Sequence, residues 1–248
     1  MDASQPADSN TKGVFLTAEW RHLAMLNYEV DPSVLLKFVP AGTELDRWNG
    51  KIFLSLVGFR FLNTKVFGIP FPFHRNFEEV NLRFYVRRRE REDIKRGVVF
   101  IREIVPRWAI ATVARTFYSE NCAALPMSHQ IQTIDNGQLV VEYAWKSGTS
   151  WNRVGLNVRG DPALPKAGSE EQFITEHWWG YTAQKDGSSA EYHVTHPAWR
   201  GWSGENVLVE GDMEGLYGRD LASVLKNPPA SAFLADGSEV TVARGRRL

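Results

Sequence analysis

The chain has 248 residues, 43% of them hydrophobic and 12% aromatic, and its 29 basic and 29 acidic residues leave no formal net charge. This length and apolar content are enough for one large domain with a substantial core. The balanced charge excludes a strongly basic chain that would be drawn to nucleic acid or to anionic membranes, so we expect neither partner.

Cys122 is the only cysteine, so no disulfide can form within the chain, and a reducing, cytoplasmic location is expected. Residues 1–12 are polar, without a basic start or an apolar run, and we predict that they are disordered and form no signal peptide. No stretch of the sequence approaches the roughly 18 apolar residues that a membrane-spanning helix needs. We expect a single domain over residues 13–243 and a frayed basic tail over residues 244–248.

The first half of the chain is predicted to contain strands and one short helix. Residues 31–40 predict that helix, with Asp31 as its N-cap, Pro32 in its first turn and Pro40 after its end. Residues 51–61 are apolar on both faces, which is typical of a buried strand. Residues 79–87 alternate between apolar and mostly polar side chains, which predicts a strand with two different faces. One face carries Val80, Leu82, Phe84 and Val86, and the other carries Glu79, Asn81, Arg83, Tyr85 and Arg87.

Residues 97–105 predict an antiparallel neighbour for this alternating strand, with the charged residues 87–96 as a solvated hairpin loop between the two. Acidic residues interrupt the arginines of that loop, which argues against a nucleic-acid-binding patch. Residues 106–118 change period and predict a helix. Arg115 lies beside the apolar stripe of that helix, which consists of Ile110, Val113, Ala114 and Phe117.

The second half of the chain predicts further strands over residues 138–146, 152–159 and 190–196. Residues 160–171 are rich in Pro and Gly and predict a surface loop, and residues 217–229 predict a short helix that two prolines end. Residues 231–242 predict a hairpin that turns at Asp236 and Gly237. Many strands with few, irregularly spaced helices favour a β-rich barrel or sandwich over a wound parallel sheet.

The common catalytic motifs are absent from the sequence. It has no glycine-rich dinucleotide or phosphate loop, no Gly-x-Ser-x-Gly and no His-Glu-x-x-His, so we expect neither a nucleotide enzyme nor an α/β-hydrolase. His193 and His196 would point to opposite faces of a strand, so we interpret them as structural and expect no metal or cofactor. An aromatic group close together in sequence would either fill the core or form the wall of a ligand pocket. This group is Trp178, Trp179, Tyr181, Trp199 and Trp202.

The polar face of residues 79–87 has two interpretations. It is a solvated sheet face, or it lines a polar cavity inside a barrel, because strand side chains alternate between the two faces of a barrel wall. In the second case Arg83 would need a carboxylate, from the protein or from a ligand.

Several segments taken together resemble one bacterial family. They are LTAEWRHLAMLNYEVDP, FEEVNLRFYVR, GVVFIREIVPR, the residues AR, YSE and LPM between 114 and 127, FITEHWWGY, HPAW and PPASAFLADGSEV. Over about residues 14–243 the chain resembles the YqjF-like family of uncharacterised bacterial proteins, which is distantly similar to acetoacetate decarboxylase. The resemblance implies a β-rich α+β fold, in the form of a cone-shaped β-barrel around a cavity with a few flanking helices.

The resemblance also implies where a decarboxylase site would lie. In acetoacetate decarboxylase, a Gly-Arg-Glu run leads to paired lysines, one of which forms a Schiff base with the ketoacid. Residues 114–116 match that run without its acid, residues 121–123 stand near the lysine pair without a lysine, and Glu79 falls near a strand carboxylate. Without that amine no iminium can form, so Schiff-base decarboxylation is not expected. Glu120 is a neighbour of the wrong sign to activate Cys122, which we interpret as structural.

Three functions remain open. The first is a cavity protein that binds a small anionic or oxygen-rich molecule through Glu79, Asn81, Arg83, Arg115 and Glu120. The second is a lyase, hydratase or isomerase that uses Glu79 as general acid or base in the same cavity. The third is a structural or interaction protein whose barrel is filled by its own tryptophans. The sequence identifies no ligand and no oligomeric state, and leaves open whether the chain is an enzyme.

Overall fold

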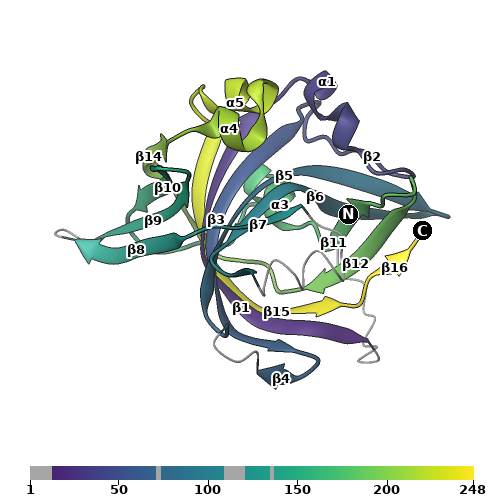
Figure 1. Cartoon of the computed structure of the whole chain (residues 1–248), viewed down its shortest axis with the longest axis horizontal. Coiled ribbons are helices and arrows are strands. Elements are labelled where there is room, and N and C mark those ends of the chain that lie inside the picture. The colour runs from purple at the N-terminus through teal and green to yellow at the C-terminus, as the bar shows by residue number, and fades with distance from the viewer. Residues whose placement is uncertain (1–12, 71–73, 109–120, 135–136) are drawn as a thin grey trace.

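Figure 1 shows the computed structural model of the chain, which describes residues 13–70, 74–108, 121–134 and 137–248. The described chain is mostly strand, as predicted. Its strands are β1 (Val14–Glu29), β2 (Glu44–Leu45), β3 (Phe53–Val66), β4 (Ile69–Pro70), β5 (Phe77–Glu90), β6 (Asp93–Val105), β7 (Cys122–Ala124), β8 (Met127–Ile134), β9 (Gln138–Ser147), β10 (Ser150–Val158), β11 (Trp179–Ala183), β12 (Ser189–Thr195), β13 (Gly201–Ser203), β14 (Glu205–Glu210), β15 (Ser231–Ala243) and β16 (Arg246–Arg247). Its helices are α1 (Pro32–Leu35), the 3₁₀ turn Leu36–Phe38, α3 (Glu170–Thr175), α4 (Met213–Tyr217) and α5 (Arg219–Leu225).

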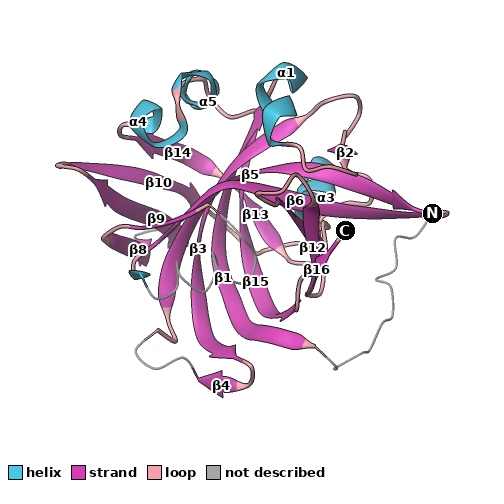
Figure 2. Cartoon of the chain, turned by 45° about the vertical axis from the view of Figure 1, so that its right-hand side comes forward, coloured by secondary structure: helices cyan, strands magenta, loops and turns pink. Residues whose placement is uncertain are grey.

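A closed ring of strands dominates the fold. In hydrogen-bonding order it runs β15, β1, β3, β5, β6, β11 and β12, and β12 pairs back onto β15. Strands β5 and β6 are antiparallel neighbours, as predicted, whereas β6 and β11 pair in parallel. In Figure 2, β3, β1 and β15 run side by side as one curved wall.

A second sheet packs outside this ring. It has four strands in the order β14, β10, β9 and β8. A large apolar cluster, which includes Leu82 and Trp145, joins it to the ring. The contact is close because β3 carries Gly58, where a Cβ would lie 2.5 Å from the ring of Tyr143. The Tyr143 hydroxyl donates to the carbonyl of His22 at 2.8 Å. The helices α1, α4 and α5 lie together at one end of the molecule (Figure 1).

The two faces of β5 pack in opposite directions. Val80, Leu82, Phe84 and Val86 belong to the cluster under the outer sheet, and Phe77 and Tyr85 belong to a separate cluster inside the ring. The polar face therefore points inward. Glu79, Asn81 and Arg83 are 6%, 1% and 7% exposed, so the solvated-face interpretation is wrong.

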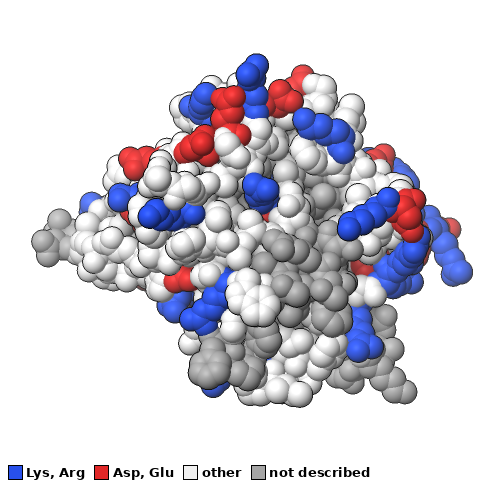
Figure 3. Space-filling view, in the orientation of Figure 1, with Lys and Arg blue, Asp and Glu red and all other residues white. Residues whose placement is uncertain are grey.

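Several local predictions are confirmed. Asp31 caps α1 by accepting from the backbone N–H of Ser33 at 2.8 Å. The three predicted strands of the second half are present as β9, β10 and β12. No helix of the described chain is long and apolar enough to cross a membrane. On the face shown in Figure 3, acidic and basic side chains are interspersed.

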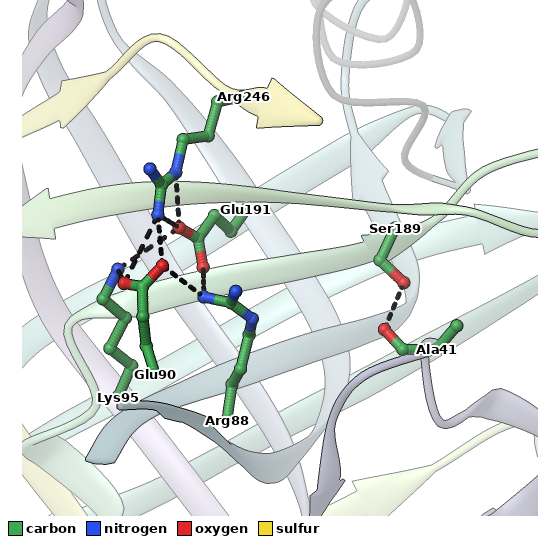
Figure 4. A network of polar contacts seen from close by, with 7 residues as sticks. All are labelled: Ala41, Arg88, Glu90, Lys95, Ser189, Glu191 and Arg246. Carbon is green, nitrogen blue, oxygen red and sulfur yellow. Dashed lines mark hydrogen bonds and ion pairs between the residues drawn. The ribbon is translucent and has the colours of Figure 1, made fainter. Parts of the chain in front are cut away.

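Three other predictions are wrong. Strand β15 does not turn at Gly237 but continues along β1. Gly237 is needed there because a Cβ would lie 1.9 Å from the carbonyl oxygen of Trp20. The charged run 87–96 is not a loop, since β5 and β6 continue through it and leave only Arg91 and Glu92 for the turn. The basic tail is not frayed, because β16 pairs with β12 (Figure 4).

Some predictions fall on residues that the structure does not describe. The helix predicted over residues 106–118, which carries Arg115, lies mostly outside the described residues. Glu120 and residues 1–12, which were predicted to be disordered, also lie outside them.

Candidate functional site

The inner face of the ring lines a cavity of about 130 Å³. Most of its wall is apolar, including Phe15, Leu23, Phe59, Phe100, Val194 and Trp199. Polar side chains gather in the remainder: Glu79, Asn81, Arg83, Glu103, Thr175, His177 and His196. An apolar cavity of about 150 Å³ holds one benzene molecule, so this space suits a ligand of about six non-hydrogen atoms.

Strand β5 brings three of the sequence-predicted site residues into this cavity. Glu79, Asn81 and Arg83 share its inner face because side chains two apart on a strand point the same way. The amide nitrogen of Asn81 donates to Glu79 Oε1 at 2.9 Å. The predicted partners Arg115 and Glu120 lie outside the described residues, so their place at the site stays a prediction.

Arg83 has a buried guanidinium group without a countercharge in close contact. One of its terminal nitrogens lies 3.9 Å from the sulfur of Met25, and its Cζ lies 5.9 Å from the centre of the Tyr85 ring. No ion pair joins it to any residue that the structure describes, and its Nε has no hydrogen-bond partner there. Such a buried cation is costly unless an opposite charge, from the protein or from a ligand, pairs with it.

Glu103 also lines the cavity, and the sequence did not reveal it. On β6, Ile101 is an extra residue, because Leu82 pairs with Arg102 while Arg83 pairs with Phe100. This β-bulge shifts the alternation by one and turns Glu103 inward. Asn121 holds the bulge: its side chain donates to the carbonyl of Ile101 at 3.1 Å, and its own carbonyl accepts from Glu103 N at 3.0 Å. A bulge interrupts the regular alternation of side chains along a strand, so that alternation could not predict the inward position of Glu103.

His177 lines the cavity and is hydrogen-bonded to a buried carboxylate, that of Asp46. Its Nε2 donates to Asp46 Oδ2 at 3.2 Å, and Arg96 Nε donates to the same oxygen at 2.7 Å. Burial raises the pKa of Asp46, but these two hydrogen bonds outweigh burial and hold the pKa at about 2. Burial also lowers the pKa of His177 to about 4, so the ring is neutral at neutral pH.

His196 is the second buried histidine of the cavity. Its ring stacks on Trp199 with 4.1 Å between ring centres, and its Nδ1 donates to the carbonyl of Pro197 at 2.8 Å. Burial is the main reason that the pKa of His196 is lowered to about 4, and the nearby charge of Arg83 acts in the same direction. Within the described part of the chain, no group of three or more His, Cys, Asp and Glu side chains could hold a metal ion.

Comparison with known proteins places the chain in a family. Residues 17–239 match the family model DUF2071, described as an uncharacterized conserved protein. The chain is a member of the DUF2071 family. The uncharacterized protein YqjF of Bacillus subtilis (strain 168) is 37% identical over 68 residues, which is 27% of this chain and 28% of YqjF. The predicted resemblance to the YqjF-like family is therefore confirmed.

Solved structures share the fold of this DUF2071 protein. Acetoacetate decarboxylase from Legionella pneumophila has a TM-score of 0.66 at 13% identity, over 99% of this chain and 93% of that one. The enduracididine biosynthesis enzyme MppR, in a structure with pyruvate, has a TM-score of 0.64 at 12% identity, over 100% of this chain and 97% of that one. An acetoacetate decarboxylase-like enzyme from Sphingomonas wittichii RW1 has a TM-score of 0.62 at 13% identity, over 99% and 100%. These likenesses confirm the predicted fold class.

Cys122 of the DUF2071 protein is 3% exposed and belongs to the apolar cluster inside the ring. Its strand β7 pairs with β6 so that Cys122 stands opposite Glu103. The residues that resemble the lysine-bearing segment thus lie beside the cavity wall. No described residue that lines the cavity is a lysine. The predicted aromatic group is divided: Trp199 walls the cavity, and Tyr181 packs in the cluster under the outer sheet.

Acid is expected to destabilise the DUF2071 protein well above the pKa range of its carboxylates. His177 and His196 have pKa values lowered from 6.5 to about 4, so between these values the unfolded chain binds more protons than the folded one. The free energy of unfolding therefore has its full value above about pH 6.5. It decreases as the pH falls toward 4, by on the order of 3 kcal/mol for each histidine. Urea unfolding at pH 7 and at pH 4.5 measures this difference.

His177→Asn and His196→Gln are each expected to reduce that difference. His129→Gln, on the outer strand β8, is the matched control for loss of a histidine. An unfolding free energy that stays level from pH 7 to pH 4.5 would show that the two buried rings are protonated in the folded state.

Proposed function

We propose that this DUF2071 protein binds a small organic anion of about six non-hydrogen atoms in the cavity of its ring, with Arg83 anchoring the acid group. The observation that carries this proposal is the state of Arg83, which is 7% exposed, lines the cavity and has no ion pair with any described residue. A carboxylate ligand would supply two acceptors for its planar guanidinium, the arrangement that such a group binds best.

Two further observations support a small acid. The apolar wall provides contact for a short carbon skeleton, while Arg83 and Asn81 stand together on one side of the space. MppR, which has the same fold at 12% identity, was solved with pyruvate bound, and pyruvate is an acid of the size that the cavity allows. The cavity also argues against a ring filled by its own tryptophans.

The acid would be held without a covalent bond. An imine requires an amine, and no lysine is present among the described residues that line the cavity. Borohydride reduction in the presence of acetoacetate should therefore leave the mass of the protein unchanged.

Catalysis in the same cavity is the second candidate, and the histidine geometry favours it. Because the Nδ1 of His196 donates to a carbonyl, Nε2 carries the lone pair of the neutral ring, and the His196 side chain lines the same cavity as Glu79 and Glu103. Proton transfer at carbon beside a carbonyl, as in a lyase, hydratase or isomerase, would use Glu79 as general base or acid. Such a reaction would show as deuterium uptake from D₂O into a bound ketoacid, which Glu79→Gln would abolish.

Ligand-dependent melting tests the binding proposal. Carboxylates of three to seven carbons, including pyruvate, butanoate and benzoate, are compared with the amides of the same acids. A ligand at a hundred times its Kd stabilises the folded state by about 2.7 kcal/mol, which raises Tm by roughly 5–10 °C for a chain of this size. We expect that shift for at least one acid and none for its amide.

The matched control is Arg219→Met, which removes a side chain that is 87% exposed on α5 and should keep the shift. A panel in which no acid raises Tm, or in which acids and amides act alike, would overturn the proposal.

A further inference from the structure

Asn81, which lines the cavity, holds a second polar atom without a hydrogen-bond partner within the described chain. The side chain is 1% exposed, and its amide nitrogen donates to Glu79 Oε1 at 2.9 Å. A carboxylate oxygen only accepts, so the nitrogen of Asn81 must be the atom that faces Glu79. The carbonyl oxygen Oδ1 is thereby directed elsewhere, and it has no hydrogen-bond partner within the described chain. A buried acceptor in that state is uncommon and costly.

Several other described polar side chains of the cavity make hydrogen bonds within the protein, although Trp20 Nε1 and His177 Nδ1 have no hydrogen-bond partner within the described chain. Thr175 donates to the carbonyl of Glu171 at 2.7 Å, His177 donates to Asp46, and His196 donates to Pro197. Glu79 and Glu103 each have further contacts of their own. Besides the nitrogens Trp20 Nε1 and His177 Nδ1, the described wall thus offers a ligand a cation, Arg83, and an acceptor, Asn81 Oδ1.

These two groups stand next to each other on one face of β5. Residues two apart on a strand are about 7 Å apart along the chain, a span that a three- or four-carbon molecule covers once both side chains extend toward it. A molecule that satisfies both must carry an acid group for Arg83 and, a few bonds away, an N–H or O–H donor for Asn81. A simple fatty acid or a ketoacid provides only the first.

We infer that the ligand is a short hydroxy acid or amino acid, whose hydroxyl or ammonium group donates to Asn81 Oδ1 while its carboxylate binds Arg83. This inference rests on the proposed function and narrows it to a ligand class. Asn81 is the specificity-determining residue, and Glu79 is the positioning residue that fixes the orientation of the Asn81 amide.

Calorimetry with a matched four-carbon series tests the inference. The ligands are butanoate, 3-oxobutanoate, 3-hydroxybutanoate and 3-aminobutanoate, and the two-substituted hydroxy and amino acids repeat the comparison with the donor one carbon closer. We expect at least one donor-bearing acid to bind ten times or more tighter than butanoate and 3-oxobutanoate. Whether the hydroxyl or the ammonium series shows the gain identifies the donor.

Asn81→Ala is expected to remove that preference, so that the four affinities agree within about threefold while butanoate still binds. If this variant fails to fold, the ratio of affinities in the unchanged protein decides alone. Equal affinities across the series in the unchanged protein would overturn the inference and leave the proposed function standing. A trapped water molecule would then donate the hydrogen bond to Asn81 Oδ1 in place of the ligand. Absence of binding by every acid would overturn both.

Discussion

Glu191→Gln is expected to lower the free energy of unfolding by about 3–5 kcal/mol, the range for removing one partner of a buried ion pair. Glu191 is 0% exposed and accepts from three cations. Arg88 lies at 3.2 Å, Lys95 at 3.3 Å and Arg246 Nε at 2.6 Å from its oxygens (Figure 4). The amide would leave these three positive charges close together with Glu90 as their nearest acidic neighbour.

The position of this network in the fold accounts for the size of the effect. Arg88 comes from β5, Lys95 from β6, Glu191 from β12 and Arg246 from β16, so one carboxylate joins four strands, three of which belong to the ring. Lys95 also lies 4.1 Å above the ring of Trp179, a residue at the cavity. Loss of the carboxylate should therefore loosen both the C-terminal pairing and the cavity wall.

Urea unfolding of the unchanged protein and of Glu191→Gln, each at low and at high salt, measures the loss in the free energy of unfolding. Glu29→Gln is the control, because Glu29 forms an ion pair with Lys51 at 2.9 Å in which the two side chains are 51% and 46% exposed. Exposed pairs contribute under about 1 kcal/mol and are screened by salt. Equal costs for the two substitutions would mean that Glu191 contributes no more than a surface carboxylate.

Arg83→Met is expected to weaken binding of the acid at least thirtyfold without lowering the stability of the ligand-free protein by more than about 1 kcal/mol. Truncating one partner of a buried, hydrogen-bonded charge pair costs about 2–5 kcal/mol of binding. In the ligand-free protein no described carboxylate loses an ion pair, and methionine removes a desolvated charge from an apolar space while keeping much of the side-chain volume.

Two measurements on Arg83→Met separate the effect on stability from the effect on binding. Urea unfolding without ligand measures stability, and calorimetry with the tightest-binding acid of the panel measures affinity. Arg219→Met should leave both values unchanged. A loss of several kcal/mol of stability in ligand-free Arg83→Met would show that Arg83 serves the fold through a protein carboxylate, one of the two partners expected from the sequence for a buried arginine.

Local patterns predicted much of the fold, and contacts between distant segments account for most of the errors. The alternation of residues 79–87 correctly placed Glu79, Asn81 and Arg83 on one face. It did not show that this face turns inward, because that depends on the outer sheet that covers Leu82 and Phe84. Asp236–Gly237 resembles a tight turn, but the glycine instead permits close approach of β1.

The candidate site was predictable to the extent that its residues follow the strand period. Glu103 was missed because the bulge at Ile101 interrupts that period, and the bulge depends on Asn121 from another segment. The tail was expected to fray because its sequence is basic and polar. Its order comes from Glu191, which is 55 residues away in the sequence and unpredictable from the tail itself.

The most direct test of the central claim is a crystal structure of the protein with the tightest-binding short acid. The account predicts the acid inside the ring, with a carboxylate oxygen about 3 Å from a guanidinium nitrogen of Arg83. An acid found instead in the outer groove beside Lys166 and Trp202, or a cavity without it at saturating concentration, would contradict the account.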